Sequence, residues 1–247
     1  MIEFIDIHKS FGPKSVLRGV DLEVKKGEIM FIIGQSGAGK SVLVKHLVGL
    51  LRPDAGRVIL DGEDITDLSE KGYYRIRKKC SYVFQNSTLF DSMTLLDNVA
   101  LPIRKHEHVS LKQAREMAMQ KLALVDMQDE AERYAADFGD GMRKKVAIAR
   151  ALTLNPEFVI FDEPTTGIDP ISANIVDRLI KDLSVRLGVT SIVVSHDLRS
   201  IFGVADRVAM LYKGQFVLDG PPSAYRTTED PIVQQFINGR PEGPMEV

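Results

Sequence analysis

A glycine-rich loop between two apolar segments constrains the fold of this chain more than any other feature. The loop consists of Gly34, Gln35, Ser36, Gly37, Ala38, Gly39, Lys40 and Ser41. It matches the phosphate-binding pattern G-x-x-x-x-G-K-[ST] at every fixed position. The mostly apolar run 28–33 before it predicts a strand covered on both faces, and the run 41–47 after it predicts a helix. Strand, loop and helix together form the first half of a βαβ unit.

Each fixed position of the loop has a physical reason. Glycines let backbone N–H groups turn inward and form a nest for phosphate oxygens. The helix that follows directs the positive end of its dipole at the same point. Lys40 adds a mobile positive charge for the β- and γ-phosphates, and the Ser41 hydroxyl is a ligand for Mg²⁺. A glycine-rich turn without a ligand is the alternative, and the flanking strand and helix disfavour it.

A pair of acids supplies what such a loop needs from a second strand. Asp162 and Glu163 directly follow the apolar run 158–161, so they emerge at the carboxyl end of a predicted buried strand. Ligands bind at that end in open α/β sheets. We expect Asp162 to hold Mg²⁺, through water, and Glu163 to polarise the attacking water as a general base. A surface acidic pair that ends a strand is the alternative, and the presence of the loop disfavours it.

Composition excludes other classes of protein. The 247 residues suit one large α/β domain or a main domain with an inserted subdomain. Lys and Arg number 32 against 34 Asp and Glu, a balance that predicts no nucleic-acid partner because such a partner needs a strongly basic face. The single cysteine, Cys80, excludes an intramolecular disulfide, and its apolar-leaning surroundings predict a small buried core residue.

The sequence shows neither a membrane span nor a signal peptide. No segment offers the roughly 18 consecutive apolar residues that a span requires. The start, Met1 to His8, alternates apolar and polar residues like a strand. We therefore expect a cytosolic protein whose membrane role depends on a partner.

Apolar and alternating runs predict an α/β fold with a helical insertion. The predicted strands are 2–7, 20–24, 28–33, 158–161, 190–194, 207–211 and 215–218. The first two alternate and are separated by the turn signal Gly12-Pro13, and the last two meet at Lys213-Gly214. A helix over 171–187 between two apolar strands indicates a parallel sheet.

The middle of the chain has a different pattern. From about residue 95 to 154 it shows helical periodicity and no convincing strand, with Ser110 as the expected N-cap of one helix. We interpret about 90–155 as a helical subdomain inserted into a single domain over 1–238. A short helix is expected near 232–237, and 239–247 is predicted to be a tail without regular structure.

The order of these motifs resembles an ABC-transporter nucleotide-binding domain, over about residues 2 to 220. Further matching segments are Gln85, Met142 to Ala151, Asp162 to Thr165, Gly167 to Pro170 and Ser195 to Asp197. The resemblance implies a P-loop NTPase core with an N-terminal antiparallel β subdomain. It also implies two subunits packed head to tail around two ATP molecules with Mg²⁺. Each site then combines one subunit's phosphate loop with the other's signature motif.

The resemblance also assigns roles to individual residues. Phe11 matches the aromatic that stacks on adenine, although a plain core aromatic is an alternative. Gln85 matches the residue that senses Mg²⁺ and the attacking water and links the site to the membrane partner. His196 matches the histidine that holds the γ-phosphate and orients the water. Asp169 matches the loop that communicates across the dimer interface.

The signature motif departs from the family pattern. The family reads Leu-Ser-Gly-Gly followed by Gln or Met, whereas this chain reads Phe138-Gly139-Asp140-Gly141-Met142. Gly139 replaces a serine whose hydroxyl bonds the γ-phosphate, and Asp140 replaces a glycine that approaches it closely. A carboxylate ~4 Å from phosphate costs several kcal/mol before Mg²⁺ screening. We therefore expect weaker ATP-driven closure and slower hydrolysis. Asp140 also reads as a good N-cap for a helix that begins near Gly141.

Several short sequence segments indicate the subfamily. The run 97–102, the signature methionine, 167–171 and the ending 233–244 resemble the Mla type, whose ATPases power phospholipid traffic between the inner and outer membranes of Gram-negative bacteria. The implied partners are a multi-span permease, a mammalian-cell-entry-type lipid-binding protein and a small regulatory subunit. The implied location is the cytoplasmic face of the inner membrane. Alternatives are an importer ATPase for a small solute such as an amino acid, a soluble ABC protein acting on ribosomes or DNA, and an ATP-binding switch with little turnover.

Overall fold

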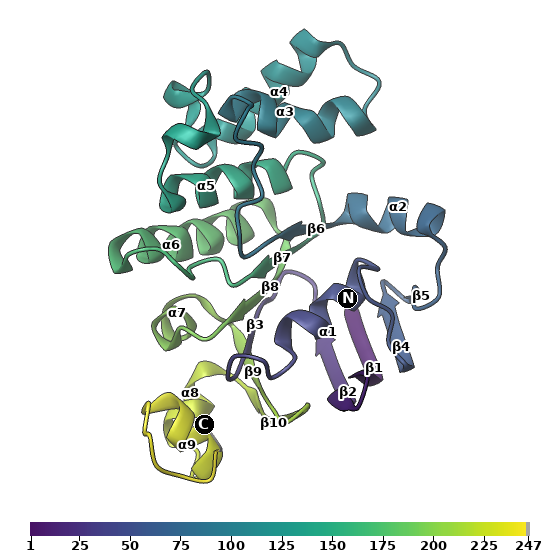
Figure 1. The fold of residues 1–247 in the computed structure, drawn as a ribbon, viewed down its shortest axis with the longest axis vertical. Helices are drawn as coiled ribbons and strands as arrows, with labels where there is room; N and C mark the ends of the chain where they lie inside the picture. The colour runs from purple at the N-terminus through teal and green to yellow at the C-terminus, as the bar shows by residue number, and fades with distance from the viewer. Residues whose placement is uncertain (246–247) are drawn as a thin grey trace. The chain divides into compact units, whose positions relative to one another are not determined.

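The computed structural model describes residues 1–245, except for the side chain of residue 199. It forms two compact units, the first from Met1–Ile76 with Thr190–Val247 and the second from Arg77–Val189. Figure 1 shows the course of the chain through both. Within the described residues, no helix is both long enough and apolar enough to cross a membrane.

The first unit begins with an antiparallel sheet of strand order β2-β1-β4-β5. Strands β1 (Ile2–Phe11) and β2 (Lys14–Val24) pair across a tight turn in which Gly12 has a φ of 57°. The alternation of the sequence thus predicted both strands correctly, and they extend beyond the predicted segments. Strands β4 (Ala55–Leu60) and β5 (Glu63–Asp64), which the sequence analysis did not predict, complete the sheet.

A second set of strands in this unit has the order β10-β9-β3-β8. All five residues of β3 (Ile29–Ile33) are buried, because parallel strands flank it on both sides: β8 (Thr190–Ser195) and β9 (Arg207–Tyr212). Strand β10 (Gln215–Gly220) returns antiparallel to β9. Their turn contains Lys213 and Gly214 at φ values of 47° and 81°, the paired positive angles of a tight hairpin.

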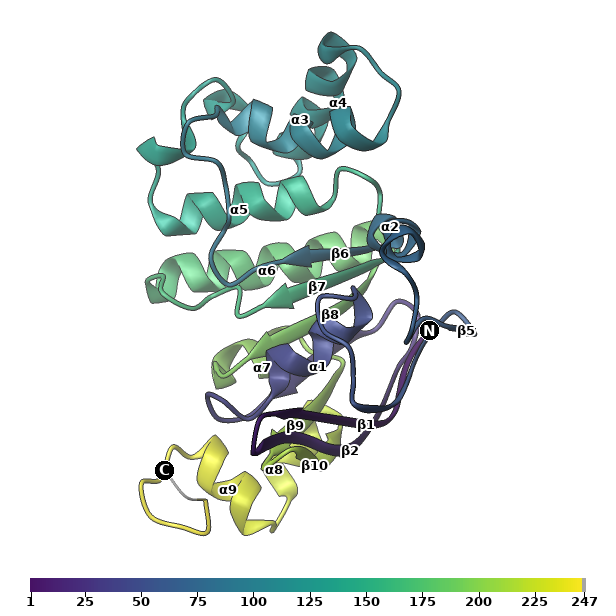
Figure 2. The ribbon, with the colours of Figure 1, turned by 45° about the vertical axis from the view of Figure 1, so that its right-hand side comes forward.

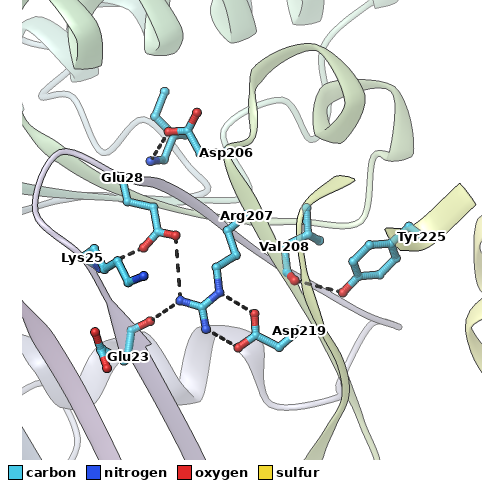
Figure 3. A network of polar contacts seen from close by, with 9 residues as sticks. Glu23, Lys25, Glu28, Asp206, Arg207, Val208, Asp219 and Tyr225 are labelled. Carbon is cyan, nitrogen blue, oxygen red and sulfur yellow. Dashed lines mark hydrogen bonds and ion pairs between the residues drawn. The ribbon is translucent and has the colours of Figure 1, made fainter. Parts of the chain in front are cut away.

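Arg207 fastens this hairpin to β2 (Figure 3). Its Nε donates to Asp219 on β10 at 2.6 Å, and its Nη1 donates to the Glu23 carbonyl at 2.9 Å. A further ion pair joins Arg207 to Glu28 at 3.8 Å, just before β3. One guanidinium therefore connects three strands of the first unit, a use that suits the planar donor fork of arginine.

Five helices accompany these strands along the chain. They are α1 (Lys40–Leu47), α2 (Glu70–Lys79), α7 (Leu198–Val204), α8 (Pro222–Thr227) and α9 (Pro231–Ile237). Helix α2 crosses the boundary between the two units. Helices α1 and α9 were predicted, whereas the sequence analysis did not predict α2, α7 or α8.

Residues 239–245 of the predicted tail contain no helix or strand, and they fold back on α9, while residues 246 and 247 lie outside the described part of the chain. The side chain of Gln235 accepts from the Met245 amide at 2.7 Å, and Met245 is only 4% exposed. A Cβ at Gly243 would lie 2.3 Å from the Gln235 Oε1 atom, so a larger residue there would displace the Gln235 side chain from this position. The polar side chain of Gln235 thus fastens the segment where periodicity predicted only a tail.

The second unit pairs β6 (Cys80–Val83) with β7 (Phe158–Asp162) in parallel. Cys80 is buried, as predicted. Four helices belong to this unit: α3 (Leu95–His106), α4 (Leu111–Ala123), α5 (Asp140–Ala151) and α6 (Pro170–Leu187). In Figures 1 and 2, α5 lies alongside α6 with α3 and α4 beyond it. Within 95–154 the structure contains helices and no strand, which confirms the predicted helical region.

Candidate functional site

The glycine-rich loop joins β3 to α1 in a backbone conformation that glycine alone adopts readily. Gly34 has a φ of 144°, and a Cβ there would lie 2.2 Å from the Leu211 carbonyl oxygen. Gly39 has a φ of 107° and is the N-cap of α1, so the first turn of the helix opens at the end of the loop. The predicted strand, loop and helix are thus all present in this order.

Lys40 is folded back across this loop. Its side chain is 5% exposed, and its Nζ donates to the carbonyls of Gly34 at 2.9 Å and Gln35 at 3.0 Å. These bonds hold a positive charge beside the N-terminus of α1, where the dipole also favours an anion. Ser41, in the first turn of the helix, is half-buried. The loop therefore places a cation beside a helix N-terminus, an arrangement that suits an anion.

His196 and Phe11 lie near the loop on neighbouring elements of the first unit. Ile33 pairs with Ser195, so the loop and His196 leave adjacent parallel strands at the same level. Phe11 ends β1, and it is 47% exposed, which makes the alternative of a core aromatic wrong. The hairpin that carries Phe11 reaches the loop, because a Cβ at Gly39 would meet Val16 and Leu17 at 3.0 Å.

In the second unit, Asp162 ends β7 as predicted and is 5% exposed. The hydroxyl of Tyr82, on β6, donates to its Oδ2 at 2.6 Å. Burial is the main cause that raises the pKa of the Tyr82 phenol, and the Asp162 carboxylate raises it further. The phenol is therefore protonated and acts as a hydrogen-bond donor at neutral pH. Tyr82 was not predicted as a site residue, because nothing in the run 80–84 distinguishes it from an ordinary core aromatic.

Glu163 follows in a left-handed backbone conformation with a φ of 52°. Such a φ is uncommon for a residue with a Cβ and is found where the surroundings hold the backbone. The carboxylate accepts from the Thr166 hydroxyl at 2.9 Å and is half-buried. The two acids therefore occupy different surroundings, which suits the different roles predicted for them.

Lys144 connects two of the predicted site segments, although the sequence analysis assigned it no role. Its Nζ donates to the carbonyls of Gln85 at 2.7 Å and of Glu163 at 3.2 Å. Gln85 itself follows β6 with an exposed side chain. A lysine in a positively charged helix reads as a solvated residue, so only the structure reveals that this one is buried.

The altered signature begins α5 at a different residue from the one predicted. Gly139 is the N-cap, and Asp140 is the first helical residue. The prediction of Asp140 as N-cap is therefore wrong, because the helix starts one residue earlier than expected. Its carboxylate still lies in the first turn, where the dipole stabilises a negative charge. Gly141 packs against α6, since a Cβ there would lie 3.0 Å from the Ser172 side chain.

Asp169 caps α6. Its carboxylate accepts from the amides of Ile171 at 2.9 Å and Ser172 at 3.0 Å. The hydroxyl of Ser172, and after it these backbone amides, lower the pKa of Asp169. The structure thus gives Asp169 a local structural role besides the one implied by resemblance.

A cleft of about 420 Å³ runs between these segments of the second unit. It is lined by Gln85, Thr88, Asp140, Lys144 and Thr166, among others. The second unit thus gathers the signature helix and the segments after β6 and β7. The first unit gathers the phosphate loop, His196 and the hairpin of Phe11.

A family model described as ABC transporter matches residues 17–166, more than half of the chain. The chain belongs to the ABC transporter family. As a member of that family it is an ABC-type ATPase with a nucleotide-binding fold. The P-loop core, antiparallel sheet and helical region predicted from the sequence are those of an ABC cassette.

Curated relatives match nearly the whole cassette. A probable ribonucleotide transport ATP-binding protein, mkl, of Mycobacterium tuberculosis is 38% identical over 99% of this chain and 68% of its own length. The intermembrane phospholipid transport ATP-binding protein MlaF of Haemophilus influenzae is 36% identical over 99% of this chain and 93% of its own. MlaF of Escherichia coli K12 is 35% identical over 99% of this chain and 91% of its own. The resemblance to the Mla type is thereby confirmed.

Solved ABC cassettes share the fold. One, a dimeric cassette in a post-hydrolysis state bound to ADP and phosphate, is 29% identical with a TM-score of 0.82 over 90% of this chain and 99% of its own. Another, cbiO1 of Clostridium perfringens, is 26% identical with a TM-score of 0.84 over 97% of this chain and 94% of its own.

Proposed function

We propose that this chain is the ATP-hydrolysing subunit of a phospholipid ABC transporter. Two copies close head to tail around two ATP molecules with Mg²⁺ and drive a separate permease. The observation that carries the ATPase proposal is the Lys40 ammonium held 2.9 Å from the Gly34 carbonyl at the N-terminus of α1. That arrangement concentrates backbone amides, a helix dipole and a buried cation at one point.

The phosphate loop and Asp162 are proposed to hold the nucleotide and its metal. Residues Gly34 to Gly39 offer backbone N–H groups to phosphate oxygens, and Lys40 balances the β- and γ-phosphate charge. Ser41, Asp162 and Gln85 are the proposed oxygen ligands of Mg²⁺, directly or through water. When bound, Mg²⁺ neutralises charge on the phosphates and orients them for in-line attack.

Hydrolysis is assigned to residues that orient and deprotonate a water. Glu163 accepts a proton from the water as general base, with its carboxylate aligned by Thr166. His196 donates to the γ-phosphate and fixes the position of the water, and Gln85 contacts both water and metal. Phe11 stacks on the adenine ring through its exposed face.

Dimer formation is proposed to complete each site. Gly139, Asp140 and Gly141 of one copy face the nucleotide held by the other, and Asp169 lies at the interface. The departures at Gly139 and Asp140 slow closure without abolishing turnover. A dimeric cassette among the solved relatives supports this arrangement.

The proposed partners place the cassette at a membrane. It binds a multi-span permease at the cytoplasmic face of the inner membrane, in a complex with a mammalian-cell-entry-type lipid-binding protein and a small regulatory subunit. The match to MlaF over 93% of that protein's length supports phospholipid as the cargo. The mycobacterial relative, at 38% identity, is named for ribonucleotide transport and supports a small-solute cargo as the second candidate.

Nucleotide chemistry is tested with the purified chain. We expect Mg²⁺-dependent ATP binding and phosphate release, loss of affinity in Lys40→Ala, and retained binding without turnover in Glu163→Gln. Absence of Mg²⁺-dependent ATP binding by the parent chain contradicts the proposal. Binding without phosphate release, even with the permease present, identifies an ATP-binding switch instead.

Cargo is tested in the assembled transporter. The cassette and its permease are reconstituted in nanodiscs, and ATPase activity is measured with added phospholipid or with ribonucleotides. Stimulation by phospholipid, with phospholipid bound to the purified complex, supports the Mla-type proposal. Stimulation by ribonucleotides alone supports the second candidate.

A further inference from the structure

We propose that Lys144 is a positioning residue that locks the main chain at Gln85 and at Glu163 to helix α5. This inference rests on the proposed function, because it assigns Lys144 a part in aligning the residues that handle the attacking water. Lys144 itself touches neither nucleotide nor metal in this assignment. Its effect passes through the two carbonyls that it binds.

The hydrogen bonds of Lys144 connect three segments of the second unit, namely α5, the chain at Gln85 and the chain at Glu163; we call this connection the tie. The side chain is 3% exposed, and its ammonium donates to Gln85 at 2.7 Å and to Glu163 at 3.2 Å. Hydrogen bonds from a charged donor are about twice as strong as neutral ones. Because Lys144 lies in α5, it also ties both carbonyls to the helix that begins at the altered signature.

The bond to Glu163 falls where the backbone needs support. Glu163 has a φ of 52°, a conformation that persists only when its surroundings determine it. The carbonyl of Glu163 accepts from Lys144 at 3.2 Å and from the Thr166 amide at 3.3 Å, and the Thr166 hydroxyl donates to the carboxylate at 2.9 Å. Without the lysine, the carbonyl loses its charged donor, so we expect the peptide to be held less firmly and the carboxylate to be less well oriented.

A second residue of α5 holds the segment next to Gln85, so the effects of the Lys144 bonds to Gln85 and to Glu163 can be tested separately. Arg150, also on α5, donates to the Ser87 carbonyl at 3.1 Å and to the Thr88 carbonyl at 2.9 Å. Arg150 thus holds the segment after Gln85 without reaching Glu163, whereas Lys144 holds both. Loosening Arg150 alone should disturb only one of the two segments.

Two nearby carboxylates partly offset the cost of burying the Lys144 ammonium. Burial lowers the pKa of Lys144, and the carboxylates of Asp140 and Glu163 act in the opposite direction. Asp140 lies one helical turn before Lys144, which is the spacing at which side chains on a helix interact. The acid of the altered signature therefore favours the charged form of the lysine.

Three variants test the tie. Lys144→Met keeps the length of the side chain but removes the donor, and Lys144→Gln retains a neutral donor. Lys145→Met is the matched control on the same helix. We expect Lys144→Met to lower kcat of the parent ATPase about 10- to 100-fold with KM for ATP within about twofold, since phosphate contacts are made elsewhere. Lys144→Gln should recover part of kcat, and Lys145→Met should match the parent.

A double-mutant cycle distinguishes positioning from simple loss of fold. In a Gln85→Ala background, Lys144→Met should lower kcat by a smaller factor than in the parent, because one of the groups it positions is gone. Equal factors in both backgrounds, or a kcat for Lys144→Met equal to that of Lys145→Met, overturn the proposal.

Hydrogen exchange gives a readout that does not require turnover, so failure of the proposed ATPase function remains distinguishable. In Lys144→Met we expect faster amide exchange at 85–88 and at 163–166 together, with the thermal unfolding midpoint near that of the parent. Arg150→Met should speed exchange at 85–88 only. Uniform acceleration across the second unit, or none at 163–166, contradicts the assignment.

Discussion

The hydroxyl of Tyr82 and the carboxylate of Asp162 are joined by a 2.6 Å hydrogen bond between adjacent strands of the second unit. The bond occupies Oδ2 of Asp162 and helps to orient the carboxylate at the carboxyl end of β7. We therefore expect the proposed binding of Mg²⁺ by Asp162 to depend indirectly on the phenol.

Removing this hydroxyl should weaken metal use more than nucleotide binding. In Tyr82→Phe we expect the Mg²⁺ concentration for half-maximal ATPase activity to rise severalfold, since a hydrogen bond to a charged group contributes about 1.5–3 kcal/mol. The measurement is ATPase rate against Mg²⁺ at saturating ATP. Tyr134→Phe, at an exposed tyrosine of the same unit, is the control. An unchanged Mg²⁺ dependence would show that Asp162 is oriented without Tyr82.

Buried tyrosines should make the fold sensitive to alkali. Burial raises the pKa of Tyr82 and of Tyr225 above the usual value near 10. Above pH 10 the unfolded chain loses protons that the folded chain keeps, so the free energy of unfolding is unaffected below that pH and falls as pH rises further. Each tyrosine contributes up to about 1.4 kcal/mol per pH unit.

Urea unfolding between pH 8 and pH 11 measures this loss. The Tyr225 hydroxyl lies 2.8 Å from the Leu218 carbonyl and 3.1 Å from that of Val208, the second contact being drawn in Figure 3. Tyr225→Phe should therefore be less stable than the parent at pH 8 but show a shallower decline above pH 10. Parallel curves for the two proteins would refute the assignment to Tyr225.

Restoring the usual signature should accelerate turnover. A Cβ at Gly139 would meet nothing within 4 Å, so a serine fits there and places its hydroxyl at the N-cap of α5. We expect the double change Gly139→Ser with Asp140→Gly to raise steady-state ATPase activity severalfold, because a hydroxyl replaces hydrogen and a carboxylate is removed. No gain in phosphate release would contradict the predicted cost of the altered motif. Gly139→Ser alone leaves Asp140 beside Lys144 and separates the two effects.

Asp169 allows a structural role to be separated from a catalytic one. Asp169→Asn keeps an acceptor for the amides of Ile171 and Ser172, whereas Asp169→Ala does not. We expect a lower unfolding midpoint for the alanine variant than for the asparagine variant at neutral pH. Hydrogen bonding lowers the pKa of Asp169 in the folded chain. The stability that the ionised cap gives the parent should therefore be lost as pH falls from the unfolded pKa toward the lowered folded pKa. Equal midpoints at pH 7 would show that the cap contributes nothing.

Sequence reasoning succeeded where a motif combines spacing with strong periodicity. Gly34 to Ser41 lies between an apolar strand and a helix, and Asp162 ends a strand of buried residues, so chain order alone located both. The helix predicted over 171–187 is confirmed as α6, and the structure adds Asp169 as its N-cap and Gly188 as its C-cap. The roles of His196 and Gln85 came from resemblance, since one histidine or glutamine carries no pattern of its own.

Other features depend on contacts between residues far apart in the sequence. Lys144 reads as one of several cations in 143–145, and its burial follows from packing against 85 and 163. Strand β4 and helix α2 each bury only two residues, Val58 and Leu60 in the strand and Tyr73 and Ile76 in the helix, so neither has an extended apolar pattern. The start of α5 was misplaced by one residue because Gly139 and Asp140 are both acceptable N-caps.

The left-handed peptide at Glu163 has a consequence for anyone who purifies inactive forms of this cassette. A side chain in that conformation costs about 1 kcal/mol, which glycine avoids. We expect Glu163→Gly, although it lacks both the acid and its bond to Thr166, to unfold at a midpoint no lower than that of Glu163→Gln, as calorimetry can measure. Screens that select only for yield or solubility would then favour inactive variants with glycine at position 163, so ATPase activity has to be measured alongside expression.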